Sequence, residues 1–505
     1  MQPVNLFFVT RSDDWSVMRD LELAFSQRKE ENAMREHEWL GMKQLVEEIV
    51  KNAKEDYLEL LDSFYLGYQI PHVGKEFDLL RIAKDGVINI ELKSRVDHPK
   101  KISNQLMKNQ YYLENLSRPI LLFTYLTSEN RLFQWIDQEL REVSFSCLFS
   151  ALRSQLVLDY ENLNTLFSPN SFLISPINTP EKFLNKEYFL TSHQQYIKKC
   201  IKEHVKDNMK KMTLVSIKGK PGTGKSLLLY DIALSFAKKE ASALFHCSNL
   251  PKGLEHLSQR LEKSIYRLHI YSIDQLEELL YGKSCSYIFI DEAHRMSFSQ
   301  YKLLMKKAKK KKLHLFLSLD PNQIMSRQEK VTDITGRVEG KKITQSFSLT
   351  NNIRFNTEIA SFIKNLMDLS AKYHYNIFSF PNVHILYAED KKQVGKYLDF
   401  LKKDGYIFIH YKPKDKKTSL DDFQGDYDVY EVVGQEFEKV VVVMNEIFYY
   451  KDGLLTSKDS KDFLYTRMLY QAVTRTRSKL SFIIWNNLPL LKQLLMIANQ
   501  TFPLE

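Results

Sequence analysis

Short apolar runs alternate with amphipathic stretches over the last three fifths of the chain. The runs have the length of β-strands and lie at 213–217, 243–247, 287–290 and 313–319, and again at 406–410, 440–444 and 480–485. A strand that is apolar at nearly every position is buried on both faces, as in a parallel sheet covered by helices. The pattern therefore predicts two α/β lobes, each built on a parallel sheet.

The first part of the chain has a different pattern. Residues 19–64 show helical periodicity with many charges, and short β-rich runs begin at about residue 67. Residues 168–179 collect Ser, Pro and Asn without periodicity, which predicts a linker. We therefore expect an N-terminal α/β domain at 1–175, followed by lobe 1 at 176–345 and lobe 2 at 346–505.

Composition and charge narrow the class of protein. The 505 residues are 44% apolar, which suits packed domains, and 72 Lys and Arg against 62 Asp and Glu favour a polyanionic partner. Four widely spaced cysteines indicate neither disulfides nor zinc. No apolar run reaches membrane-spanning length, so we expect a cytoplasmic protein with no membrane partner. The lysine-rich segment 306–312 is typical of a solvated helix end.

A glycine-rich loop carries the clearest chemical signal. The sequence GKPGTGKS at 219–226 fits the G-x-x-x-x-G-K-[ST] pattern between a strand and a helix. Its glycines, Gly219, Gly222 and Gly224, let backbone amides surround phosphates. Lys225 can reach the β and γ phosphates of ATP, and the Ser226 hydroxyl can bind Mg²⁺.

Two carboxylates follow the apolar run at 287–290. Asp291 and Glu292 then lie at the carboxyl edge of the predicted sheet, where open α/β sheets present their chemistry. Asp291 is the candidate for the Mg²⁺ shell, and Glu292 for orienting or deprotonating the attacking water. A simple helix cap is the alternative for the pair.

Further blocks occur in the order found in superfamily 1 helicases, which this part of the chain resembles. LTSHQ at 190–194 is similar to the block whose glutamine reads adenine, here Gln194. LDPNQ at 319–323 resembles the G-D-x-x-Q block, with leucine replacing glycine; in that family its glutamine, here Gln323, senses the γ-phosphate.

The second half of the resemblance lies in lobe 2. NNIR at 351–354 resembles a block that makes Arg354 a phosphate contact. GQEF at 434–437 is similar to a block whose glutamate, Glu436, meets the ribose or the catalytic interface. YQAVTRTR at 470–477 matches Y-x-A-x-T-R-x-R, which makes Arg475 the arginine finger.

The resemblance implies an ATP-driven nucleic-acid motor, because ATP binds lobe 1 and the finger comes from lobe 2. Closing and opening of the lobes would move a bound strand in steps. Only about 115 residues separate Asp291 from the strand at 406–410, which leaves little room for inserted subdomains. This compactness and the string FIDEAHR resemble the helicase-like domains of Schlafen proteins and their bacterial relatives.

The N-terminal domain contains a β-hairpin signal at 76–93. A two-residue turn at Asp85-Gly86 would pair Asp78 with Lys93 and Leu80 with Glu91. Alternation then places Asp78, Glu91 and Lys93 on one face of the hairpin, where two carboxylates could hold one cation.

This arrangement resembles the restriction-endonuclease-like PD-(D/E)xK nucleases of the NERD and RecB-like branches. Glu91-Leu92-Lys93 stands as E-x-K, and Phe77 replaces the usual proline. Asp78 and Glu91 would hold Mg²⁺, or Mn²⁺ in its place, and Lys93 would position the nucleophile. The first helix offers Glu47 or Glu48 as a further ligand, which the sequence does not distinguish, and a later helix offers Gln105 or Gln110. A salt-bridged surface is the alternative.

The leading hypothesis is a Mg²⁺-dependent nuclease fused to a translocase or helicase. It favours DNA over RNA as substrate, with phage or plasmid DNA as target. An RNA-directed nuclease of Schlafen type is one alternative. The other is an ATP-gated sensor whose N-terminal domain binds its ligand without catalysing a reaction. The sequence also leaves open a protein partner or a homo-oligomer.

Overall fold

A computed structural model describes most of the chain. The described residues are 2–11, 14–26, 34–53, 55–70, 75–95, 99–157, 163, 166–167, 174–247, 250–282, 285–321, 323–350, 357–371, 379–411, 420, 423, 425–459 and 463–500. They form two units, Met1–Phe172 and Leu173–Glu505. No helix among them combines the length and the apolar character needed to span a bilayer.

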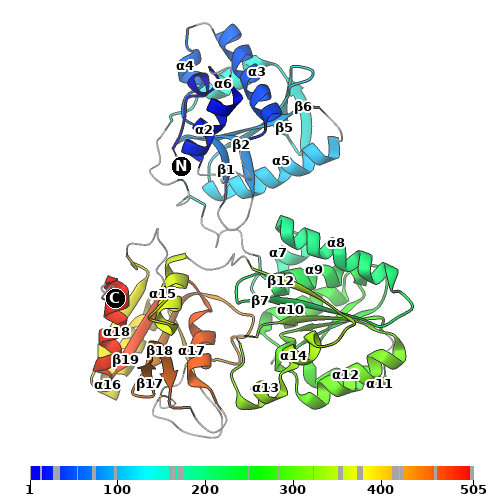
Figure 1. Cartoon of the computed structure of the whole chain (residues 1–505), viewed down its shortest axis with the longest axis vertical. Helices are drawn as coiled ribbons and strands as arrows, with labels where there is room; N and C mark the ends of the chain where they lie inside the picture. The colour runs from blue at the N-terminus through cyan, green and yellow to red at the C-terminus, as the bar shows by residue number, and fades with distance from the viewer. Residues whose placement is uncertain are drawn as a thin grey trace. The chain divides into compact units, whose positions relative to one another are not determined.

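The first unit is built on a six-stranded sheet (Figure 1). Its strands lie in sequence order, β1 (Phe64–Gln69), β2 (Glu76–Ile82), β3 (Val87–Lys93), β4 (Ile120–Leu126), β5 (Arg131–Ile136) and β6 (Glu139–Val143). Neighbours are antiparallel except β3 and β4, which are parallel because helix α5 (Pro99–Leu113) crosses between them.

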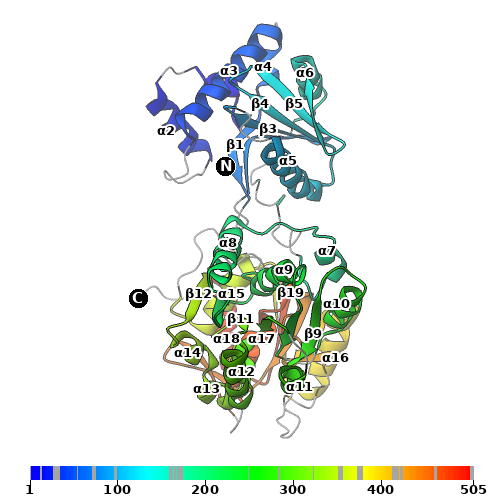
Figure 2. The ribbon, with the colours of Figure 1, turned by 90° about the vertical axis from the view of Figure 1, so that its right-hand side faces the viewer.

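Helices cover both faces of this sheet (Figures 1 and 2). One face packs α3 (Glu36–Ala53) against Leu79, Ile88 and Ile90, and α5 lies on the other face. The first face also carries α1 (Leu6–Val9), α2 (Trp15–Ser26), α4 (Tyr57–Leu60) and α6 (Phe145–Arg153). The 3₁₀ turn Glu114–Leu116 follows α5.

The hairpin of β2 and β3 has a different register from the one that the Asp-Gly turn predicted. Leu79 pairs with Ile90 and Ile82 with Val87, so the turn spans 83–86 and is closed by a hydrogen bond from Ala83 N to Gly86 O (2.9 Å). The predicted pairing was therefore wrong by two residues. Because the shift is even, every side chain keeps its predicted face.

Lobe 1 of the second unit is a parallel six-stranded sheet, as the apolar runs predicted. Its order is β12 (Thr344–Leu349), β7 (Thr213–Gly219), β11 (His314–Leu319), β10 (Tyr287–Asp291), β8 (Ser242–His246) and β9 (Leu268–Ser272). Its helices are α7 (Pro180–Leu184), α8 (Ser192–Asp207), α9 (Lys225–Ala237), α10 (Lys252–Glu262), α11 (Leu276–Tyr281), α12 (Phe298–Lys311), α13 (Arg327–Thr332) and α14 (Ile334–Glu339), with 3₁₀ turns at Ile273–Gln275 and Ala293–Arg295. Since β12 pairs with β7, lobe 1 extends to Leu349 and not to 345.

Lobe 2 repeats the design. Its five strands run in the order β13 (Val383–Ala388), β19 (Thr476–Trp485), β16 (Phe437–Met444), β14 (Ile407–His410) and β15 (Tyr427–Asp428), all parallel. The helices are α15 (Thr357–Met367), α16 (Lys391–Lys403), α17 (Tyr465–Val473) and α18 (Leu488–Asn499), beside a hairpin of β17 (Phe448–Lys451) and β18 (Leu454–Ser457). The parallel order at both lobes confirms the predicted α/β class.

Residues 174–179, which we call the strap, are packed and do not form a free linker. Ile174 and Ile177 are 6% and 3% exposed and belong to the lobe 1 core. The strap also meets lobe 2, where Asn178 Nδ2 donates to Glu436 O (3.4 Å). The linker prediction was wrong here because two isoleucines among the Ser, Pro and Asn residues bury themselves; residues 168–173 lie outside the described residues.

Candidate ATP site and N-terminal carboxylate cluster

The glycine-rich loop joins β7 to α9 at the carboxyl edge of the lobe 1 sheet. Gly222 and Gly224 have φ of +79° and +80°, in the left-handed region that favours glycine. A Cβ on Gly219 would lie 2.4 Å from Thr223 Oγ1, so that position is also closed to larger residues. The loop therefore turns tightly onto the first turn of α9, whose free N–H groups suit an anion.

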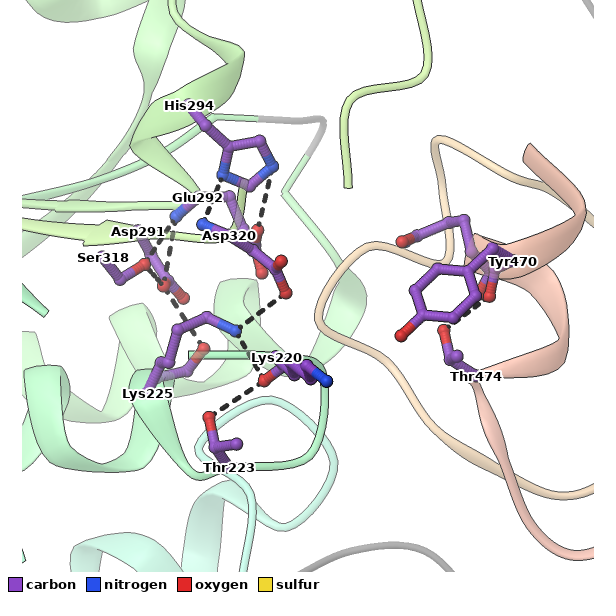
Figure 3. Close-up of polar contacts among 12 residues, drawn as sticks. Lys220, Thr223, Lys225, Asp291, Glu292, His294, Ser318, Asp320, Tyr470 and Thr474 are labelled. Carbon is purple, nitrogen blue, oxygen red and sulfur yellow. Dashed lines mark hydrogen bonds and ion pairs between the residues drawn. The ribbon is translucent and has the colours of Figure 1, made fainter. Parts of the chain in front are cut away.

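The amine of Lys225 lies inside this loop (Figure 3). Its Nζ donates to Lys220 O (3.0 Å) and lies 3.2 Å from Asp320 Oδ2. Both side chains are almost completely buried, and a buried ammonium needs such a partner to offset its lost hydration. Asp320 directly follows β11, and β11 lies next to β10, the strand that carries Asp291.

Asp291 ends β10 and is held by hydroxyls. Ser318 Oγ donates to its Oδ1 at 2.5 Å, and Ser226 Oγ lies 3.3 Å from the same oxygen. Burial, and then the neighbouring Glu292 carboxylate, raise the pKa of Asp291. The two predicted Mg²⁺ ligands of this site, Ser226 and Asp291, thus lie together.

Glu292 adopts a left-handed backbone conformation with φ of 56°, which is costly for a residue with a side chain. Its N–H donates to Ser318 Oγ (2.9 Å), which helps to hold this conformation. Burial favours the neutral acid, but His294, and then cations that include Lys225 and Arg475, lower the pKa of Glu292 to about 2. The carboxylate is therefore ionised at neutral pH.

His294 is a neighbour of Glu292 that sequence reasoning did not single out (Figure 3). Burial lowers the pKa of His294 to about 4, so the ring is neutral at pH 7. Asp320 N–H donates to its Nδ1 (3.2 Å), which leaves the ring proton on Nε2. That nitrogen lies 3.6 Å from Glu292 Oε2, so the ring directs its N–H toward the Glu292 carboxylate.

Several buried polar atoms at this edge have no hydrogen-bond partner among the described residues. They include Asp291 Oδ2, Glu292 Oε2, His294 Nε2, Gln323 Oε1 and both ring nitrogens of His246. Buried polar atoms are normally satisfied by protein or water, so unsatisfied atoms that converge at one edge are typical of a ligand site.

Gln194 is placed against the glycine-rich loop. Its Oε1 accepts from Thr191 N (3.0 Å), and its Nε2 donates to Thr223 O (3.4 Å). In this conformation the amide braces the loop and caps α8, and the predicted contact with adenine stays a prediction.

Lobe 2 brings Arg475 to the same region. Arg475 is 5% exposed and its charge acts on Glu292 across the lobes. Glu436 accepts two hydrogen bonds from Arg477 (2.9 and 3.0 Å), and its predicted contact with the ribose or the catalytic interface stays a prediction. Arg354 lies outside the described residues.

A cleft of about 580 Å³ lies between the two lobes. It is lined by Lys220 of the glycine-rich loop and, from α15 and α17, by Lys364, Arg467, Tyr470 and Thr474. Figure 3 shows Tyr470 and Thr474 on the side of the site opposite Lys220 and Lys225. The cleft is large enough for a small ligand, and most of its charged lining residues are cationic.

The three predicted residues of the N-terminal site also lie together. Lys93 Nζ lies 3.8 Å from Asp78 Oδ2 and 3.6 Å from Glu91 Oε2, so one ammonium bridges both carboxylates. Asp78 Oδ2 accepts from Leu92 N (2.9 Å). With the observed register, Asp78 lies opposite Glu91 and not opposite Lys93.

Amide side chains surround Glu91, whose side chain is only 1% exposed. Gln105 of α5 donates to Oε2, Asn109 of α5 to Oε1 (2.7 Å), and Asn89 to Oε1 (3.4 Å). Gln105 is thus the glutamine at this cluster, because Gln110 bonds Glu114 and Trp135 instead. Glu91 is therefore part of a buried hydrogen-bond network, whereas Asp78 and Lys93 are partly exposed.

Glu47 does not join the cluster, contrary to the prediction. Its side chain is exposed, and the α3 carboxylate that acts on Asp78 and Lys93 is Glu38, nine residues earlier on the helix. Nine residues correspond to about 13 Å along a helix, which explains why the two cannot share a site. Glu48 pairs with Lys51, 3.8 Å away. Among the described residues, no group of three or more His, Cys, Asp and Glu side chains is arranged for a metal ion.

Burial and the neighbouring charges shift the pKa values of Asp78 and Lys93 in this cluster. Burial, and then the Glu91 carboxylate, raise the pKa of Asp78 to about 7, although the Lys93 ammonium opposes the shift. Burial lowers the pKa of Lys93, but the carboxylates of Asp78 and Glu91 outweigh burial and raise it overall. Lys93 therefore stays protonated at neutral pH.

Sequence reasoning missed Asp320, Ser318 and His294 in lobe 1, and Glu38, Asn89 and Asn109 in the first unit. A polar residue at the end of β11 could have indicated Asp320, as it did for Asp291. His294 stands in the string FIDEAHR, which could have indicated it. The other residues had no signal, because hydroxyls, amides and glutamates near helix ends are common on any surface.

Comparison with known proteins identifies part of the second unit. Residues 212–406 match the family model described as Schlafen group 3, DNA/RNA helicase domain. This part of the chain is therefore similar to a helicase domain. No curated relative matches the chain.

Solved structures resemble the chain only distantly. A Pif1 helicase from Bacteroides, in complex with ADP-AlF3 and ssDNA, is 13% identical with a TM-score of 0.32, covering 58% of this chain and 92% of its own. RecG bound to a three-way DNA junction is 12% identical with a TM-score of 0.32, covering 64% and 47%. DnaA from Aquifex aeolicus, bound to AMPPCP, is 15% identical with a TM-score of 0.24, covering 45% and 66%.

Proposed function

We propose that the chain is an ATP-driven nucleic-acid translocase or helicase joined to a Mg²⁺-dependent nuclease. The observation that carries the motor part is the convergence of Lys225, Asp291 and Glu292 at one sheet edge with Arg475 from the other lobe. The match of residues 212–406 to a DNA/RNA helicase domain supports a nucleic acid as the track.

Each residue of the ATP site has a role that its surroundings support. Ser226 and Asp291 would hold Mg²⁺, which supplies charge neutralisation for the transferred phosphoryl group. Lys225 would bind the phosphates, and its ammonium must then leave Asp320 to contact them. Glu292, ionised with a pKa of about 2, accepts a hydrogen bond from the attacking water and orients it.

The nuclease part rests on the cluster of Asp78, Glu91 and Lys93. Mg²⁺ is often held by one or two carboxylates and completed by water, so these two carboxylates suit it. Bound there, Mg²⁺ would activate water and stabilise charge on the phosphate. Lys93 would leave its bridging position and contact the phosphate, and Glu38 would add negative charge at the end of α3.

One observation favours an alternative in which the first unit only binds and the chain is an ATP-gated sensor. Glu91 is held by three amides and by Lys93, and the ammonium occupies the place where a cation would lie. A buried polar network of this kind could be purely structural.

A double dissociation tests the proposal. ATP hydrolysis and cleavage of matched DNA and RNA in Mg²⁺ are measured for the wild type, Lys225→Ala and Asp78→Asn. Lys225→Ala should lower hydrolysis at least about 100-fold and retain cleavage in the absence of ATP. Asp78→Asn should abolish cleavage of the preferred substrate, which we expect to be DNA, and retain hydrolysis.

The matched controls are Lys392→Ala and Glu47→Gln, which make similar substitutions at exposed residues. They should change neither ATP hydrolysis nor cleavage. Full hydrolysis by folded Lys225→Ala would refute the motor. If the wild type cuts neither nucleic acid with Mg²⁺ or Mn²⁺, the sensor alternative replaces the nuclease; cutting of RNA alone would establish the RNA-directed alternative.

A further inference from the structure

The amino edge of the lobe 1 sheet is basic. All six strands are parallel, so their first residues lie at the edge opposite Lys225 and Asp291. The segments that precede three neighbouring strands carry lysine pairs: 341–342 lies in the turn before β12, 210–211 in the turn before β7, and 309–310 in the last turn of α12 before β11. The pairing of Thr213 with His314 and of Leu214 with Thr344 places these turns side by side.

The same pattern continues along the edge. Lys238 and Lys239 precede β8, and Arg267 directly precedes β9. These three side chains are exposed, as are all those of the three lysine pairs except Lys341, which is half-buried. From β12 to β9 the sheet has five inter-strand steps of about 4.8 Å, so this basic edge is about 24 Å long.

The positive charge of the basic edge is only partly balanced by carboxylates. Asp207, Glu240 and Glu262 lie at the same edge, against nine cations. Two further lysines of α12 interact with α11 instead, since Lys307 Nζ lies 3.3 Å from the Tyr281 ring centroid and Lys311 donates to Leu280 O (2.9 Å).

Helix stabilisation explains only part of this charge. Lys309 and Lys310 lie in the last turn of α12, where cations favour the helix dipole. The pairs at 210–211 and 341–342 lie beyond the ends of α8 and α14, in connecting turns that the dipole does not reach.

A groove opens within the basic edge. It has a volume of about 390 Å³ and lies beside the end of α8. Its lining includes Lys211, Lys342 and Asn208 as well as the apolar Met212 and Ile343. The two ammonium groups on this lining suit a phosphate oxyanion.

We propose that the basic edge binds the sugar-phosphate backbone of a nucleic-acid duplex, on a surface separate from the cleft between the lobes. Lysines supply point charges that contact phosphates without reading bases. Over 24 Å a duplex carries on the order of a dozen phosphates, because it has one charge per about 1.7 Å of axis.

The chemistry favours a duplex over a single strand. Sites for single strands stack bases on exposed aromatic rings. Among the described residues of this part of lobe 1, the exposed ring of Tyr281 has the ammonium of Lys307 over one face, which leaves at most the other face for a base. Nucleic acid as the ligand follows the proposed function, but the charge of the edge does not depend on ATP hydrolysis.

Neutralisation tests the proposal in the full chain. The variant changes Lys210, Lys211, Lys309 and Lys310 to Gln, and the control makes the same change at four exposed lysines of lobe 2, Lys392, Lys396, Lys403 and Lys492. Duplex and single-strand affinities are measured from 50 to 200 mM salt, with ATP hydrolysis in the absence of nucleic acid as the check on folding.

The variant should bind duplex at least about tenfold more weakly at 150 mM salt than the control. Its salt dependence should be shallower by about 0.9 for each phosphate that the variant no longer neutralises. Its hydrolysis without nucleic acid should equal that of the control, which keeps this result distinct from failure of the motor. Equal duplex affinity in variant and control, or a loss confined to the single strand, would overturn the proposal.

Discussion

Two carboxylates of this chain, Glu292 and Asp78, have opposite pKa shifts, and the neighbouring charges explain the difference. Glu292 lies beside His294 and near cations from both lobes, and together they outweigh burial and lower its pKa to about 2. Asp78 lies beside another carboxylate, and one lysine does not compensate for burial and Glu91, so its pKa rises to about 7. Glu292 is thus ionised at neutral pH, whereas the pKa of Asp78 lies near neutral pH.

This shift predicts how Mg²⁺ binding to the first unit depends on pH. Only ionised Asp78 can bind the metal, and with a pKa of about 7 its ionised fraction is about a tenth at pH 6. The apparent Mg²⁺ affinity should therefore be about tenfold weaker at pH 6 than at pH 8, measured by calorimetry. The same shift lowers folding stability progressively from pH 4 to pH 7, because the unfolded chain ionises first.

Asp78→Asn should remove both effects of pH, and Glu47→Gln should keep them, since Glu47 is exposed and does not act on Asp78. An unchanged Mg²⁺ affinity between pH 6 and pH 8 in the wild type would contradict the role given to Asp78.

At the scale of elements, the strap shows how a loop-like sequence becomes part of a core. Ile177 packs into lobe 1 while its side chain also reaches Gly434 of lobe 2, where a Cβ would lie 2.5 Å from Ile177 Cδ1. Its carbonyl lies directly over Gly253 in α10. The strap thus contacts both lobes, and its packing requires glycine at positions 253 and 434.

Gly253→Ala should destabilise the second unit. The new Cβ would lie 1.7 Å from Ile177 O, so the strap or α10 must move, and overpacking of this kind costs about 1–3 kcal/mol. Calorimetric unfolding of the full chain should show a lower midpoint for the transition of this unit.

The matched control is Gly395→Ala in helix α16, where a Cβ meets nothing within 4 Å. It should raise stability by up to about 1 kcal/mol, because alanine is the better helix former. If both changes stabilise the protein, the strap is not packed against α10.

At the scale of the whole molecule, the proposed ATP site of the second unit needs groups from both lobes. The ATP-site groups lie on lobe 1, and the charge of Arg475 reaches Glu292 from lobe 2. Arg475 also donates from Nε to Gln471 O (3.3 Å), so the guanidinium is held by its own lobe and moves with it. Closure of the lobes would bring that charge to the γ-phosphate.

Arg475→Ala should therefore slow ATP hydrolysis at least about 100-fold and leave nucleotide binding within a few-fold of the wild type. Turnover and nucleotide affinity are measured separately, with exposed Arg327→Ala as the control. A comparable loss of binding in Arg475→Ala would show that the arginine holds the fold of the site and does not act as a finger.

The sequence by itself determined the α/β class of both lobes, the position of the glycine-rich loop and the face of each hairpin residue. These are local properties, since apolar runs, glycine spacing and two-residue alternation depend on neighbours along the chain. For the same reason Asp78, Glu91 and Lys93 could be placed on one face although the predicted register was wrong.

Only the tertiary structure decided which residues from distant segments meet. Glu38 and not Glu47 approaches Asp78, Gln105 and not Gln110 reaches Glu91, and Asp320 pairs with Lys225. The packing angle of a helix and the order of strands in a sheet set such contacts, and single-sequence periodicity carries information on neither. The basic edge arose in the same way, because its lysine pairs are far apart in sequence and become neighbours only through the strand order β12-β7-β11.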